Sequence, residues 1–169
     1  GYDGTWGKYT IKVNATPAND QCENAIPVAD SVLYPGRTYS GSTAGATPTL
    51  LGPANPLVTS NGGNNDTLDV WYAYTPTVSE EVTISLCSAS LFNATMGLFD
   101  ACSGSGIASN DDACVLQPQI TQELTAGQTY LIRIAGWGGL VGDYTLTVTG
   151  GQGTDMRIEK PFDLIGHLS

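Results

Sequence analysis

The sequence predicts an all-β domain: a two-sheet antiparallel sandwich, jelly-roll-like and stapled by disulfides. Its 21 Gly and 9 Pro, together with abundant Thr, Ser and Asn, are typical of a chain with many turns. Short alternating or β-branched runs replace the Ala-, Leu-, Glu- and Lys-rich stretches of helices. The 169 residues are 41% hydrophobic and 13% charged, which is enough for one packed core.

Eight runs bounded by Gly, Pro, Asn or Asp have the pattern of strands. In chain order they are 8–13, 37–43, 67–75, 81–87, 95–100, 120–124, 129–135 and 143–149. In the third run, Trp71 alternates with apolar neighbours, so we expect both faces to be covered. In the seventh, apolar residues alternate with Leu131 and Arg133, which predicts a central strand with one partly wet face.

Two segments do not fit the strand pattern. Residues 44–66, rich in Pro, Gly and Asn, predict a long loop, and loops of this length are often functional. The tail 150–169 begins with glycines and then becomes charged and apolar, so we expect Phe162, Leu164 and Ile165 to dock on another surface. The expected organisation is an N-terminal strand and linker at 1–18, a sandwich domain at 19–149 and a docking tail at 150–169.

The charge balance excludes several partners. Six Lys and Arg stand against sixteen Asp and Glu, for a net charge of −10 and a pI near 4.1. Such a surface repels phosphate backbones and anionic lipids, so no nucleic acid is expected as a partner. No apolar run approaches the roughly 18 residues of a membrane-spanning helix, so no membrane insertion is expected either.

The four cysteines are Cys22, Cys87, Cys102 and Cys114. An even number without CxxC spacing and without a nearby His favours disulfides over zinc, and four buried free thiols are the alternative. Residues 103–113 look like a hairpin tip, so we expect Cys102 to pair with Cys114, and Cys22 with Cys87. Disulfides, few charges and little Lys together predict an extracellular or cell-surface location.

The sequence contains an internal repeat. Residues 1–13 (GYDGTWGKYTIKV) align without a gap with residues 136–148 (GWGGLVGDYTLTV), and six positions are identical. The chain therefore opens with a second copy of its own closing strand. That copy is the remnant of a preceding module, an edge strand of its own sandwich, or a strand donated to another subunit. In the last case the assembly strand comprises Lys8, Tyr9, Thr10, Ile11, Lys12 and Val13.

Several motifs also occur, in this order, in a known family. They are NDQCENA at 19–25, DVWYAYT at 69–75, FDAC at 99–102, SNDDAC at 109–114, GQTYLIRI at 127–134 and GDYTLTV at 142–148. Over residues 19–148 the chain resembles the bacterial pre-peptidase C-terminal type of β-sandwich module of secreted and surface proteins. The resemblance implies a jelly-roll-like sandwich, export and no catalytic residues. It also implies that polysaccharide, protein fibres or calcium could be ligands.

No catalytic set is apparent, so no enzyme activity is expected. The sequence has no GxSxG motif, and its one His, His167, lies in the tail. Asp100, Asn110, Asp111 and Asp112 are oxygen ligands of the kind that calcium prefers, with Asp20 and Asp69 as further candidates. The alternative is ordinary turn capping by Asn and Asp side chains.

Three aromatic residues in Gly-rich turns are candidates for stacking on a sugar: Tyr2, Trp6 and Trp137. The alternative is that these rings plug the ends of the sandwich. Glycosylation sequons occur at Asn14, Asn65 and Asn93, where the abundance of Asn and Thr makes chance matches common.

Two functions remain open. The first is a non-catalytic structural subunit that forms a head-to-tail homopolymer, a filament or surface array, by strand augmentation through residues 8–13. The second is a carbohydrate- or matrix-binding accessory module of a larger secreted protein. Cofactors are not expected, apart from the candidate calcium site.

Overall fold

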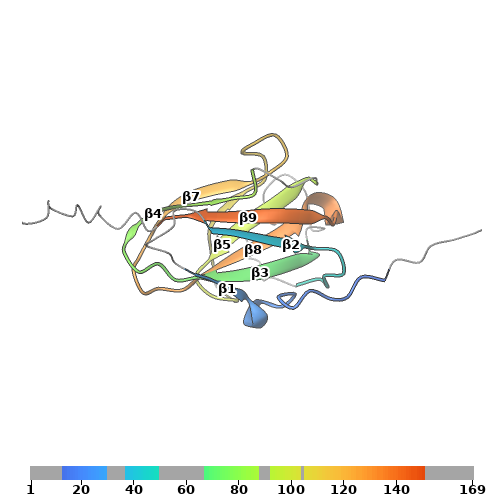
Figure 1. Cartoon of the computed structure of the whole chain (residues 1–169), viewed down its shortest axis with the longest axis horizontal. Helices are drawn as coiled ribbons and strands as arrows, with labels where there is room; N and C mark the ends of the chain where they lie inside the picture. Colours follow the sequence, from blue (N-terminus) through green and yellow to red (C-terminus); the bar gives the residue numbers. More distant parts are fainter. Residues whose placement is uncertain (1–12, 30–36, 50–66, 88–91, 104, 151–169) are drawn as a thin grey trace, which may run out of the picture.

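Two β-sheets pack face to face in a sandwich (Figure 1). The structure, a computed structural model, describes residues 13–29, 37–49, 67–87, 92–103 and 105–150. The first sheet has the strand order β1-β3-β8-β5-β6 and the second the order β2-β9-β4-β7. Neighbouring strands are antiparallel, except that β1 runs parallel to β3. The predicted all-β, two-sheet sandwich is therefore confirmed.

The described residues form nine strands and two short 3-10 turns. The strands are β1 (Ile26–Val28), β2 (Arg37–Ser42), β3 (Asp69–Tyr74), β4 (Glu80–Ser85), β5 (Ala94–Phe99), β6 (Gly106–Asn110), β7 (Gln119–Leu124), β8 (Tyr130–Gly136) and β9 (Asp143–Thr149), and the turns are η1 (Cys22–Asn24) and η3 (Trp137–Gly139). Seven predicted runs coincide with β2, β3, β4, β5, β7, β8 and β9 to within two residues at each end.

The remaining predicted run, 8–13, lies outside the described residues except for Val13. Val13 belongs to no strand and is 86% exposed. No predicted run covers β1 or β6. β1 is only three residues long and contains Pro27, and β6 (GIASN) lacks a clear alternation.

The main core lies between the sheets, where period-two patterning turns every second side chain inward. In β9, Tyr144, Leu146 and Val148 are buried while the residues between them are partly or fully exposed. Burial of each such side chain contributes roughly 1.5–3 kcal/mol. The hydroxyls of Tyr72 in β3 and Tyr144 in β9 lie 2.9 Å apart and join the two sheets across this core. Burial raises the pKa of both phenols.

The outer face of the first sheet is also covered. Trp71 is 0% and Phe99 1% exposed, and their ring centroids lie 5.6 Å apart beside Cys22 of η1. The expectation that both sides of β3 are covered is therefore confirmed. The segment around η1 is fixed there by hydrogen bonds between Asn19 and the backbone of Trp71 in both directions, each 2.9 Å long.

The partly wet face predicted for β8 is wrong at Arg133, whereas Leu131 on the same face is half-buried. β8 is central, as predicted, but Arg133 is only 1% exposed and forms an ion pair with the buried carboxylate of Asp69. Thr49 donates a second hydrogen bond to that carboxylate, 2.7 Å long. The carboxylate of Asp69 thus compensates the buried charge of Arg133, which needs no contact with solvent.

The disulfide pairing predicted from the sequence is also wrong. Cys22 pairs with Cys102, and Cys87 with Cys114, each with Cα atoms 5.7 Å apart. The stretch 103–113 is not a hairpin tip, because it contains β6. Its five residues at roughly 3.3 Å each separate Cys102 from Cys114 by well over the roughly 7 Å that a disulfide can span. All four cysteines are nevertheless oxidised.

One end of the sandwich holds the features discussed below. We call it the η3 end, because η3 lies there between β8 and β9 (Figure 1). The described parts of the connections after β2, β4 and β6 gather at the same end, as the antiparallel registers require. Ala15 also lies there, with its carbonyl against Gly45.

Candidate functional site

The strongest candidate for a binding site is the turn around η3. Among the described residues, Trp137 is the most exposed aromatic side chain, at 40%. Leu140 and Val141, in the same turn, are 49% and 43% exposed. The remaining described aromatic side chains are buried or half-buried. This turn therefore offers an apolar surface that the core does not use.

Glycines account for the shape of this turn. Gly138 and Gly139 have φ angles of 64° and 81°, a left-handed conformation that costs glycine little. Gly136 has no room for a side chain, because a Cβ there would collide with the carbonyl oxygen of Leu140. The backbone thus folds back tightly, and the N–H of Leu140 donates to the carbonyl of Trp137 at 3.2 Å.

The turn is anchored on both sides. The N–H of Trp137 donates to the carbonyl of Asn93, the residue before β5, at 3.0 Å. Gly142 closes the other side: its N–H donates to Thr43 Oγ1, and its carbonyl accepts from the Thr43 N–H, both at 3.0 Å. Thr43 is fully buried. Trp137 is therefore presented from a fixed frame of backbone hydrogen bonds.

Substitution of Gly136 tests this frame. Gly136→Ala places a methyl group on the Leu140 carbonyl, so η3 has to shift and the environment of Trp137 has to change. We expect a changed Trp fluorescence maximum and a loss of about 1–3 kcal/mol of stability, of the size typical of overpacking. Gly127→Ala is the control without a clash, because nothing lies within 4 Å of its Cβ position, so any cost there comes from its φ of 75°. Equal fluorescence changes in both variants would contradict the role of Gly136.

The candidate calcium ligands do not converge. Asp100 lies in the turn between β5 and β6, whereas Asn110, Asp111 and Asp112 lie at the opposite end of β6. The expectation that these four residues share a site is therefore wrong. In the part of the chain that the structure describes, no group of three or more His, Cys, Asp or Glu side chains could hold a metal ion.

Asn110 instead caps its turn. Its Oδ1 accepts hydrogen bonds from the N–H groups of Ala113 and Gln119, both at 3.1 Å. This matches the turn-capping alternative.

The two additional metal candidates, Asp20 and Asp69, are also engaged elsewhere. Burial acts to raise the pKa of Asp20, but hydrogen bonds from Thr47 (2.5 Å from its Oγ1) and Gln21 (2.8 Å) lower it below its ordinary value. For Asp69, burial dominates and raises the pKa, although Arg133 and Thr49 act to lower it. Both carboxylates therefore serve the structure.

Several predicted residues lie outside the described part of the chain. These are the aromatic candidates Tyr2 and Trp6, assembly-strand residues 8–12, the sequon residue Asn65 and the tail residues Phe162, Leu164 and Ile165. Of the other sequons, Asn14 is exposed. Asn93 is half-buried, and its side-chain oxygen is buried.

The chain matches the family model described as "Galactose binding domain-like" (GBD_T9SS_assoc) over residues 18–148. It belongs to this family. No curated protein is a match. One similar solved structure is the periplasmic inhibitor of g-type lysozyme from Aeromonas hydrophila, with 16% identity, 74% of this chain and 94% of that chain covered, and a TM-score of 0.47. Another is the pre-peptidase C-terminal domain of a Bacillus anthracis collagenase, with 16% identity, the same coverage and a TM-score of 0.46.

Membership of the galactose binding domain-like family refines the resemblance inferred from the sequence. The β-sandwich module is confirmed, whereas the pre-peptidase C-terminal type stays a resemblance. Within the described residues, no helix has the length and apolar character needed to cross a membrane.

Proposed function

We propose that this chain is a non-catalytic accessory module of an exported protein, and that it binds carbohydrate through the η3 turn. The exposure of Trp137 on a rigid Gly-rich turn is the observation that carries this proposal. Membership of a family described as galactose binding domain-like supports the ligand class. The two disulfides support export, because such bonds persist in oxidising compartments.

The chemistry of the turn suits a sugar ring. The indole of Trp137 can stack on the apolar C–H face of a galactose unit, much as aromatic rings stack in other contacts. Leu140 and Val141 extend the apolar surface beside the ring. The rigid frame limits the ordering cost of binding, since the turn is already held by Asn93 and Thr43.

Glycan binding by the full chain tests this function. We expect a galactose-containing polysaccharide to bind, and Trp137→Ala to weaken binding at least about tenfold, because aromatic anchors dominate such contacts. Isothermal titration calorimetry against a polysaccharide panel measures this. Ile107→Ala is the matched control, because Ile107 is also an exposed apolar residue, at 38%, but lies on β6. Absence of binding across the panel, or full binding by Trp137→Ala, would contradict the proposal.

The alternative reading, a homopolymer formed by strand augmentation, depends on residues 8–13. Of these only Val13 is described, and it is exposed and outside any strand. No feature of the described residues favours polymer formation over an accessory module.

A further inference from the structure

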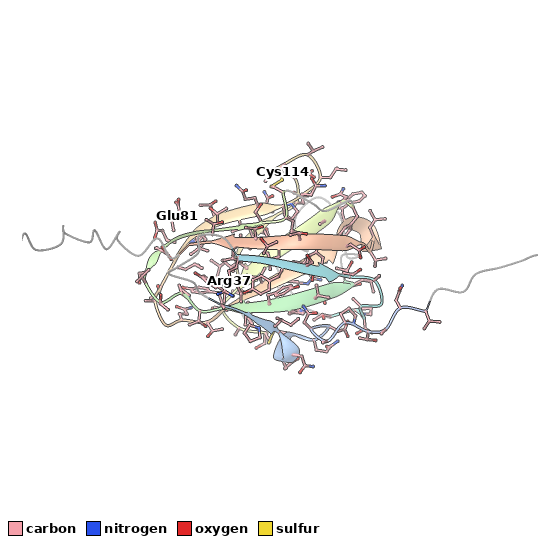
Figure 2. All side chains as sticks on the ribbon, viewed as in Figure 1. Arg37, Glu81 and Cys114 are labelled. Carbon is pink, nitrogen blue, oxygen red and sulfur yellow. A yellow bond between two sulfur atoms is a disulfide. The ribbon has the colours of Figure 1, made fainter. Side chains whose placement is uncertain are left out.

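The loop between β6 and β7, residues 111–118, projects from the sandwich, and Cys114 marks it in Figure 2. Among the described residues, Val115 is the only non-glycine with a positive φ, at 72°. A β-branched side chain is especially unfavourable in this conformation, which glycine adopts freely. Val115 is also 85% exposed, so it gains almost no packing within this chain in return.

The surrounding loop holds Val115 in this conformation. The N–H of Leu116 donates to the carbonyl of Cys114 at 3.1 Å and closes a γ-turn around Val115. The disulfide to Cys87 ties this turn to the end of β4. The carbonyl of Leu116 accepts from the N–H of Ala94 at 3.1 Å, which ties the turn to β5 as well. A strained backbone conformation that several surrounding bonds hold in place is typical of functional sites.

We propose that Val115 and Leu116 form a preformed apolar knuckle that inserts into an apolar pocket of a basic protein partner. Leu116 is 45% exposed and adds to the apolar surface of Val115. Asp111 and Asp112 precede the turn, and the chain carries a net charge of −10, so a pocket rimmed by Lys or Arg is complementary. A second copy of this chain is disfavoured by like charge. A polysaccharide lacks a closed pocket for a branched aliphatic group.

The test compares Val115→Thr with the unchanged chain, because threonine keeps the β-branched shape and adds a hydroxyl. The full chain is immobilised and exposed to the secreted proteins of the native organism, and any protein retained by it is purified and titrated. We expect a basic protein to be retained, with its affinity reduced at least tenfold by Val115→Thr and reduced by salt. Val115→Gly should also lose binding without lowering the melting temperature, because glycine relieves the strained φ.

Two controls separate this knuckle from the carbohydrate site. Val78→Thr changes a comparably β-branched, 39% exposed residue elsewhere and should leave partner affinity unchanged. Trp137→Ala should also leave it unchanged, so failure of the sugar proposal does not decide this one. Retention of no protein, retention of an acidic protein or of a polysaccharide only, or equal affinity of Val115→Thr and the unchanged chain would overturn the proposal.

Discussion

Replacing Arg133 with Met is expected to destabilise the domain by about 3–5 kcal/mol, because it leaves the carboxylate of Asp69 buried without its counter-charge. The free energy of unfolding from urea denaturation at pH 7 measures this loss. Asp69→Asn should cost a comparable amount, since it leaves the guanidinium of Arg133 buried without a counter-charge. The double variant should lose clearly less than the sum of the two. Simple additivity would mean that the two side chains do not depend on each other.

The loss should also depend on pH. Burial already raises the pKa of Asp69 in the folded protein, and removal of Arg133 raises it further. A folded-state pKa above the unfolded value means that the folded state binds the proton more readily. Stability then falls as the pH rises from about 4 through the folded-state pKa. The deficit of Arg133→Met relative to the unchanged chain should therefore be smaller at pH 4 than at pH 7.

Removal of the Cys22–Cys102 disulfide is expected to have the second large effect. This bond closes a loop of 80 residues, so the chain-entropy model assigns it about 4.5 kcal/mol. The Cys87–Cys114 bond spans 27 residues and is worth about 3.5 kcal/mol in the same model. We expect Cys22→Ala with Cys102→Ala to lower the melting temperature more than Cys87→Ala with Cys114→Ala.

Peptide mapping of the non-reduced protein provides the matched check on this pairing. A linked peptide containing Cys22 and Cys102 is expected. A peptide linking Cys102 to Cys114 would contradict the fold described here, because β6 holds those two residues apart.

Much of this fold is predictable from local pattern. The alternation in β9 and the apolar run of β3 both identify strands. A strand buried on one face alternates apolar and polar residues, and a strand buried on both faces is apolar throughout. The disulfide pairing is not local: it depends on which strands become neighbours, and β6 has too weak a pattern to reveal itself. The ion pair of Asp69 and Arg133 is missed for the same reason, because it joins residues 64 positions apart.

The candidate site is predictable only in part. Trp137 stands out in the sequence because glycines surround it, but its exposure is decided by how Gly136 and Gly138 turn the chain. Asn110 and its neighbours look like metal ligands by residue type alone, yet the carboxylate of Asp100 lies at the other end of β6. Nothing in the sequence marks Val115, because valine is usually a strand residue and its positive φ follows from the closure of the loop.

Sugar binding by the η3 turn is measured most directly by two-dimensional NMR of the indole N–H signals of the full chain during titration with a galactose-containing oligosaccharide. The sequence has three tryptophans, so single substitutions assign each signal. We predict that the signal of exposed Trp137 shifts in a saturable manner, whereas that of fully buried Trp71 stays in place. A Trp137 signal that does not move at saturating sugar, or that moves no more than the Trp71 signal, would contradict it.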